Sequence, residues 1–222
     1  MTKDREVDFD VDIAIRVCRQ AGYFKHALAL AEKHAKHDLY LKVQIDDNLD
    51  YKEALRYMNT LTPEECEHQM KLYGSILIDK EPEETTSLLK KLSQQPDSHP
   101  ELFIPFFIKS GSQMLAYLEH VVSIPGKMVS PLVWNTLIEY NLDVYKSMAN
   151  NDGKKDVEIK IMNILTNDKS NYATEQALVL CQLNNFAPGF LYMYQKCGLY
   201  EEILKYHFQS GNYEEGILTC RR

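Results

Sequence analysis

The apolar and polar positions along the chain follow the period of a helix, most clearly near the C-terminus. There an aromatic residue is followed at +3 by a small or aliphatic residue and at +4 by a large apolar one. The three triplets are Phe186/Gly189/Phe190, Tyr200/Ile203/Leu204 and Tyr213/Gly216/Ile217. Because positions i, i+3 and i+4 share one helical face, each triplet predicts a short helix. Asn184, Gly198 and Gly211 lie two residues before the aromatics, where a left-handed residue closes the preceding helix.

The same triplet recurs near the N-terminus, as Phe24/Ala27/Leu28 and Tyr51/Ala54/Leu55. Phe24 and Tyr51 are 27 residues apart, and so are Phe186 and Tyr213. Self-similarity at a fixed period is typical of solenoids. We therefore predict an all-α fold, an α-solenoid of stacked helical hairpins about 27 residues long. The small residues at +3 would allow neighbouring helices to approach closely, which applies to Ala27, Ala54, Gly189 and Gly216.

Proline, Ser and Thr place several helix starts between the two ends of the chain. Thr62-Pro63-Glu64-Glu65 is a capping box with Pro at the first helical position. Pro82 and Ser130-Pro131 predict two further starts. Pro105 excludes a regular helix across the apolar stretch 102–107. No segment alternates strongly enough between turn residues to predict a strand.

The polar stretch 150–156 (NNDGKKD) predicts a solvated loop or a flexible insertion. We otherwise expect residues 1–222 to form a single solenoid segment, with a possible soft boundary at this stretch. Residues 93–171 keep the helical period but lack the aromatic triplet. The helical pattern still continues at Cys220-Arg221-Arg222, so we expect the chain to be part of a longer protein.

The composition limits the classes of partner. A net charge of −7 disfavours general nucleic-acid binding, which requires Lys and Arg to displace counterions, and disfavours electrostatic attachment to anionic lipid. No apolar run approaches the length of a membrane span, so we expect no direct membrane insertion. The acidic N-terminal stretch MTKDREVDFDVD does not have the character of a signal peptide. Five scattered cysteines without a CxxC indicate a reducing, cytoplasmic environment.

Two clusters suggest a metal site, and neither has the ligands it would need. Asp8, Asp10 and Asp12 alternate as in a calcium loop, but Ile13 and Arg19 stand where the loop needs Gly and Glu. We interpret these acids as a helix N-terminus. His34 and His37 have an i, i+3 spacing without a third ligand nearby, which favours a solvated helix end. We therefore predict no metal and no cofactor.

No motif indicates catalysis. Gly126-Lys127 lacks the remaining residues of a phosphate loop, and Gly111-Ser112 is not in the context of a nucleophile elbow. Acidic pairs occur at Glu64/Glu65, Glu83/Glu84 and Glu201/Glu202. They lie where acids stabilise the first turn of a helix. We predict no catalytic residue, and the sequence assigns no partner-binding residue.

Several segments resemble the clathrin heavy-chain repeat of vesicle coats and tethers. They are residues 8–34, 40–58, 82–92, 103–107 (FIPFF), 117–120 (YLEH) and 177–220. Within that repeat class the chain is most similar to the Pep-five-type vacuolar protein-sorting subunits (subunit eleven), core subunits of the HOPS and CORVET tethers. The resemblance covers nearly the whole chain, is specific at both ends and is loose over about 122–171.

This resemblance implies a non-enzymatic scaffold in the cytoplasm, peripheral on endosome, lysosome or vacuole membranes. Its solenoid faces would bind other tether subunits, which in turn recognise small GTPases and fusion machinery. In that family the solenoid joins a β-propeller to a RING finger. These 222 residues contain neither, so the zinc and ubiquitin-ligase activity of a RING are not expected here.

Two other interpretations remain open from the sequence. The same solenoid could serve a different coat or a nuclear-pore-type assembly. An all-α hydrolase with an unrecognised site would also fit the helical pattern, and a deep pocket with convergent titratable side chains would favour it.

Overall fold

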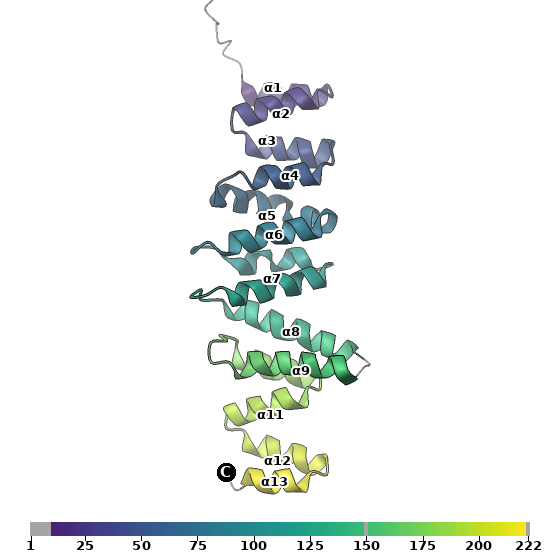
Figure 1. Ribbon diagram of the computed structural model, residues 1–222, viewed down its shortest axis with the longest axis vertical. Coiled ribbons are helices and arrows are strands. Elements are labelled where there is room, and N and C mark those ends of the chain that lie inside the picture. The colour runs from purple at the N-terminus through teal and green to yellow at the C-terminus, as the bar shows by residue number, and fades with distance from the viewer. Residues whose placement is uncertain (1–9, 149–150, 221–222) are drawn as a thin grey trace, which may run out of the picture. The chain divides into compact units, whose positions relative to one another are not determined.

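The computed structural model describes residues 10–148 and 151–220. In these two ranges the chain forms thirteen α-helices, one π-helix and one 3-10 helix, with no strand (Figure 1). The helices are α1 Val11–Gln20, α2 Phe24–Lys33, α3 His37–Lys42, η1 Val43–Asp47, α4 Tyr51–Met58, α5 Pro63–Lys80, α6 Pro82–Ser93, η2 Pro100–Phe107, α7 Gly111–Ser123, α8 Pro131–Ser147, α9 Asn151–Thr166, α10 Thr174–Leu183, α11 Ala187–Lys196, α12 Tyr200–Gln209 and α13 Tyr213–Cys220.

Successive helices pack as hairpins. The pairs α1/α2, α5/α6, α8/α9, α10/α11 and α12/α13 make the most extensive contacts, and α2 also packs on α3 and α11 on α12. The predicted all-α fold, an α-solenoid of stacked hairpins, is thereby confirmed.

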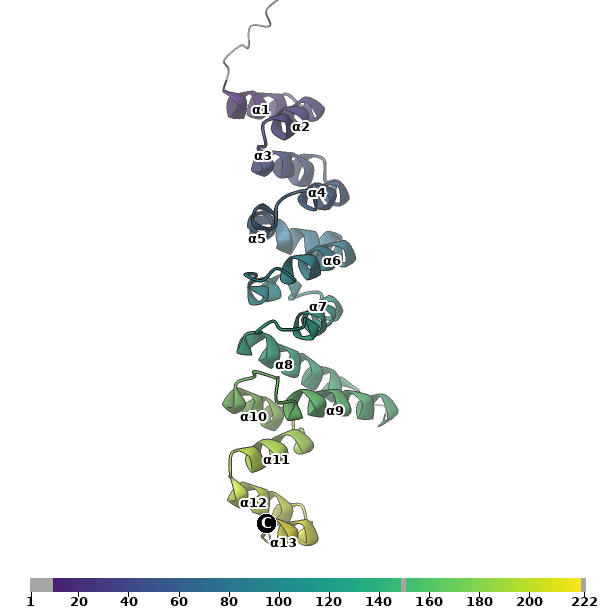
Figure 2. The ribbon, with the colours of Figure 1, turned by 60° about the vertical axis from the view of Figure 1, so that its left-hand side comes forward.

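The contacts group the chain into two compact units, Met1–Ser98 with Pro105–Gln113, and His99–Ile104 with Met114–Arg222. Both views show α1 to α4 following one another within the first unit and α11 to α13 within the second (Figures 1 and 2). A single solenoid segment over 1–222, with its soft boundary at 150–156, stays a prediction.

The helix ends confirm most of the predicted turns and correct one of them. Gly22, Gly198 and Gly211 have φ of 77°, 71° and 74°, a left-handed conformation in which glycine has no Cβ penalty. Asn184 has φ −93°, and the left-handed residue is Asn185 at 52°. The adjacent Asn pair explains the error, because Asn tolerates this conformation and either residue could adopt it.

This shift moves the Phe186 triplet one residue out of register with the others. The amide of Tyr23 donates to the Cys18 carbonyl at 2.8 Å, and that of Phe186 to the Cys181 carbonyl at 2.9 Å, as in a Schellman turn. Phe186 therefore corresponds to Tyr23, the residue before α2, and not to Phe24. It is the N-cap of α11, whereas Phe24, Tyr51, Tyr200 and Tyr213 are first residues of helices.

The repeat length also differs between the units. Left-handed residues at Gly22, Ala35 and Leu49 define a repeat of 27 residues in the first unit, as predicted. In the second, Asn185, Gly198 and Gly211 define one of 26, which corrects the predicted 27. The extra residue in the first unit coincides with the π-helix η1, Val43–Asp47, since a π-turn takes one residue more than an α-turn.

The small residues at the +3 positions lie where helices contact each other, and the contact is tight at all of them except Gly216. Ala27 and Ala54 are fully buried. A Cβ on Gly189 would overlap the Phe186 ring and lie 2.8 Å from the Cys181 Sγ, so the close approach predicted here is confirmed. A Cβ on Gly216 would lie 3.6 Å from its nearest neighbour, the His207 Cβ, so this contact is looser than predicted.

Between the ends of the chain, the predicted helix starts and the break at Pro105 are confirmed. Pro63, Pro82 and Pro131 each occupy the first turn of a helix. The stretch with Pro105 forms the 3-10 helix η2 instead of a regular α-helix.

The loop predicted at 150–156 is wrong from residue 151 on, because α9 begins at Asn151 and continues without a break. Lys154 of α9 places its ammonium 4.5 Å from the centroid of the Tyr145 ring on α8. Lys155 and Asp156 are exposed, so the polar residues of this part of the stretch belong to the first turns of a helix. Residue 150 lies outside the described residues, as does Asp8 of the acidic N-terminus.

Candidate partner-binding site

The described residues that suggested a metal site stand at the ends of helices. His34 is the C-cap of α2, whereas His37 begins α3 and contacts residues of α4 and α5. Asp10 is the N-cap of α1, where its carboxylate accepts from the amides of Asp12 and Ile13. Across residues 10–148 and 151–220, no group of three His, Cys, Asp or Glu side chains could hold a metal ion.

The same described residues contain no helix that is both long enough and apolar enough to cross a membrane. The acidic pairs stand in the first turns of α5, α6 and α12, as predicted.

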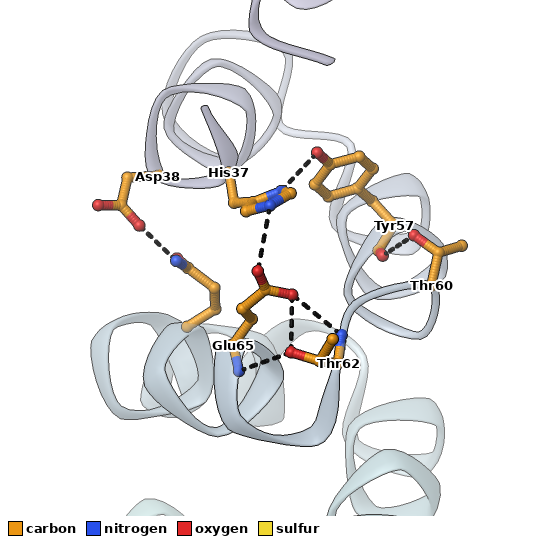
Figure 3. A network of polar contacts seen from close by, with 7 residues as sticks. His37, Asp38, Tyr57, Thr60, Thr62 and Glu65 are labelled. Atoms are coloured by element: carbon orange, nitrogen blue, oxygen red, sulfur yellow. Dashed lines mark hydrogen bonds and ion pairs between the residues drawn. The ribbon is translucent and has the colours of Figure 1, made fainter. Parts of the chain in front are cut away.

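A network of polar contacts joins three helices of the first unit. His37 Nδ1 on α3 lies 2.8 Å from the Tyr57 hydroxyl on α4, and His37 Nε2 lies 3.6 Å from a carboxylate oxygen of Glu65 on α5. Figure 3 shows His37 between these two side chains. The Tyr57 ring stacks on Tyr40 with centroids 3.8 Å apart, and burial raises the pKa of both phenols. The network therefore joins the polar contacts of His37 to the stacked pair of Tyr40 and Tyr57.

The capping box fixes the acidic side of this network. Thr62 Oγ1 accepts from the Glu65 amide at 3.4 Å, and the Glu65 carboxylate accepts from the Thr62 amide at 3.1 Å and its hydroxyl at 2.7 Å. The hydrogen bonds from Thr62, followed by the attraction of His37, hold the pKa of Glu65 below its ordinary value. Glu65 is therefore a fixed carboxylate at the N-terminus of α5.

Beside the network lies an open groove of about 620 Å³, here called the charged groove. Residues of α1, of the turn before α3, of α3 and of α5 line it: Asp12, Arg16, Ala35, Lys36, His37, Asp38, Leu39, Glu64, Glu65, His68 and Gln69. Lys36 pairs with Asp12 at 2.9 Å. The Gln69 amide nitrogen donates to Asp38, and Gln69 is only 3% exposed. These contacts hold the side chains that line the groove in place, and the lining contains both acidic and basic residues.

A second, apolar groove of about 520 Å³ lies on the α1/α2 hairpin. Its lining is Cys18, Tyr23, His26, Ala29, Leu30 and Lys33. Tyr23 is 62% exposed.

Sequence reasoning assigned none of these groove residues to a partner. The charged groove combines residues from position 12 to position 69, on three helices, and no short motif links them. The one available signal was the capping box, which correctly placed Glu64 and Glu65 on the first turn of α5.

Comparison with known families decides what kind of chain this is. The family described as PEP5/VPS11 clathrin repeat matches residues 1–222. The chain belongs to this family. The family match and the helical hairpins agree, since a clathrin-type repeat is a stack of such hairpins.

The chain is also similar to curated relatives. It is 37% identical to the human vacuolar protein sorting-associated protein 11 homolog over 99% of its own length, and 33% identical to that of Dictyostelium discoideum over 96%. The homolog of Arabidopsis thaliana is 27% identical over 98%. The chain spans 25% to 29% of the length of these relatives. No solved structure matches it.

Proposed function

We propose that this chain is a non-enzymatic scaffold segment of a membrane-tethering complex in vesicle-mediated transport and fusion at endosomes, lysosomes or the vacuole. The observation that carries the proposal is the family match over residues 1–222, together with relatives named for vacuolar protein sorting. The helical-hairpin fold supports a scaffold, because repeat arrays bury little within each unit and present extended binding surfaces.

In this proposal the helices position binding faces for other subunits of a HOPS or CORVET type. Contact with small GTPases, fusion machinery and membrane is indirect, through those subunits. The segment acts in the cytoplasm and lies peripherally on the endosomal, lysosomal or vacuolar membrane. A net charge of −7 supports partners that are proteins and not nucleic acid.

The proposal is tested by affinity purification of the full-length protein from its own cells, followed by quantitative mass spectrometry. Subunits of the endolysosomal tethers are expected to co-purify in stoichiometric amounts. A matched purification lacking residues 10–220 reports how much of this association depends on the segment. Co-purification of coat or nuclear-pore subunits in their place would overturn the proposal in favour of another solenoid assembly.

A further inference from the structure

A third open groove of the first unit, of about 560 Å³, lies where α1, α3 and η1 meet and is here called the basic groove. Its lining includes Arg16, Arg19, Leu39, Lys42, Val43 and Asp47. Three of its lining residues are basic and one is acidic, in a chain whose net charge is −7. The groove is therefore a local concentration of positive charge on an acidic protein, which favours an anionic ligand.

Two of the three basic side chains are open to solvent and have no acidic partner. Arg16 on α1 and Lys42 at the end of α3 are both exposed. Neither forms an ion pair with any residue that the structure describes. A ligand arriving from solution therefore reaches both charges directly.

The third basic side chain neutralises the acid of the groove. Arg19 donates to both carboxylate oxygens of Asp47, one of them at 3.1 Å, and also to Asp46 at 3.3 Å. With Asp46 counted, three cations face two carboxylates, and both carboxylates are already paired. The positive charge that remains for a ligand is that of Arg16 and Lys42.

The π-helix η1 forms one wall of the basic groove through Val43 and Asp47. The second unit completes its repeat in 26 residues, and the additional residue of the first unit coincides with η1. Stacking of hairpins therefore does not require this π-turn. Because π-turns inside helices are rare and frequently lie at functional sites, a binding role for the wall that η1 builds explains its presence.

The groove also has an apolar surface, which narrows the class of anion. Leu39 is partly exposed there, and the methylene stems of arginine and lysine side chains add apolar area beside it. An aliphatic side chain of a ligand packs on this surface, whereas a free phosphate or a lipid headgroup leaves it unused. The acidic charge of the whole chain also opposes an anionic membrane surface.

We propose that the basic groove binds an acidic peptide segment of a partner protein, in which carboxylates flank an aliphatic residue. Arg16 and Lys42 pair with the carboxylates, and Leu39 packs against the aliphatic side chain. The inference rests on the proposed function, in which this segment binds other proteins, and it names the chemistry of one such contact.

The test uses the full-length protein and a photo-crosslinking peptide. The probe carries a diazirine analogue of leucine between two Glu residues in a Gly-Ser background. Crosslinks located by mass spectrometry are expected within residues 15–20 and 39–47, which contain the lining of the groove. Labelling is expected to saturate with a midpoint of about 1 mM, as for two exposed charge pairs and one aliphatic contact.

Unlabelled competitor peptides separate the two kinds of contact. The peptide with ordinary leucine is expected to displace the probe with the same midpoint of about 1 mM. Replacing both Glu residues by Gln is expected to weaken competition about tenfold, because two exposed charge pairs are lost. Replacing the leucine by Ala is expected to weaken it about threefold, because less apolar surface is buried.

Variants of the protein then separate the groove from general positive charge. Arg16→Gln and Lys42→Gln are each expected to weaken labelling about threefold, as for one exposed charge pair. Lys25→Gln on α2 is the matched control and is expected to leave labelling unchanged. Lys25 is likewise exposed and unpaired among the described residues, but it does not line the groove. Thermal melts of each variant show whether the fold is retained.

The proposal is overturned if the Gln peptide competes as well as the Glu peptide, or if Lys25→Gln weakens labelling as much as Arg16→Gln and Lys42→Gln. It is also overturned if no saturable crosslink reaches the groove at about 10 mM probe. If phosphatidylserine vesicles displace the probe and the unlabelled Glu peptide does not, the groove is a lipid site and the proposal is wrong.

The proposed function and the groove fail separately. Absence of crosslinks in the groove, with tether subunits still co-purifying, would reject the groove alone. Crosslinking that responds to Arg16→Gln and Lys42→Gln, without co-purification of tether subunits, would reject the proposed complex and leave the groove as a peptide site.

Discussion

A Cβ atom added to Gly189 of α11 would lie 2.8 Å from the Sγ of Cys181 on α10. The same Cβ would overlap the ring of Phe186, which is fully buried. Two helices of the second unit thus approach each other at a point where only a hydrogen atom fits. The +3 position of the repeat is therefore a packing position here and not a flexible hinge.

Gly189→Ala is expected to destabilise the chain by about 1–3 kcal/mol, because an added methyl group in a packed contact forces its neighbours to move. Urea unfolding followed by circular dichroism measures the loss. The matched control is Gly216→Ala, where a Cβ meets nothing closer than 3.6 Å. This second variant is expected to be neutral or to stabilise by up to about 1 kcal/mol, since Ala is the better helix former. Equal losses in both variants would contradict the packing difference.

Arg19 on α1 donates to both carboxylate oxygens of Asp47 on η1, one of them at 3.1 Å, and also to Asp46 at 3.3 Å. The hydrogen bond to Asp47 is the main cause that raises the pKa of Arg19. A double-mutant cycle of Arg19→Gln and Asp47→Asn is expected to give a coupling of about 1–2 kcal/mol, as for a partly buried bidentate pair. The exposed pair Arg56 and Glu53 is the control, with about 0.3–0.5 kcal/mol expected.

Glu65 gives a pH dependence whose sign follows from its environment. Its pKa is lowered from the ordinary 4.5 by the hydrogen bonds of Thr62 and by His37. A group with a lowered folded-state pKa contributes stability above its unfolded pKa and loses that contribution as the pH falls through the folded value. Glu65→Gln is therefore expected to destabilise the chain at about pH 7 and to have a smaller effect below about pH 4. Unfolding curves of both proteins at each pH measure this difference, and a constant difference would contradict it.

Thr62→Ala is expected to cost about 1 kcal/mol, because it removes one side of the capping box of α5. Thr60→Ala is its control, since the Thr60 hydroxyl donates to the Tyr57 carbonyl at the end of α4 and takes no part in the capping box of α5. Melting temperatures of the two variants, measured side by side, provide the comparison. An unchanged melting temperature for Thr62→Ala would show that the capping box does not stabilise α5.

The cysteines provide a chemical test of the packing. Burial raises the pKa of Cys66 to about 11 and that of Cys181 to about 12, whereas Cys197 is exposed. Because the thiolate is the reactive form, iodoacetamide at about pH 8 is expected to modify Cys197 before Cys66 and Cys181. Cys66 and Cys181 are expected to react at rates set by unfolding, which mass spectrometry of timed samples measures. Fast labelling of Cys181 in the native chain would contradict the α10/α11 contact.

The fold could be predicted from local features of the sequence. Aromatic triplets with Gly two residues earlier placed α2, α12 and α13. The triplet at Tyr51, which has no such Gly, placed α4, and Pro with Thr placed α5. These signals suffice because caps, proline and helical periodicity act within a few residues of each other. The errors arose where the local sequence was compatible with two backbone conformations. Asn184 and Asn185 both tolerate the left-handed conformation, and the polar stretch from 151 to 156 suits an exposed helix as well as a loop.

The sequence by itself determined that this chain is a helical repeat, where most of its helices begin and that it resembles clathrin-type tether subunits. Only the tertiary structure decided which side chains meet. Gln69 and Asp38 are 31 residues apart, and Arg19 and Asp47 are 28 apart. Such contacts depend on the register between neighbouring helices, and η1 changes that register by one residue in the first unit. No local pattern carries that information, because it arises from packing between helices and not from the propensity of any one of them.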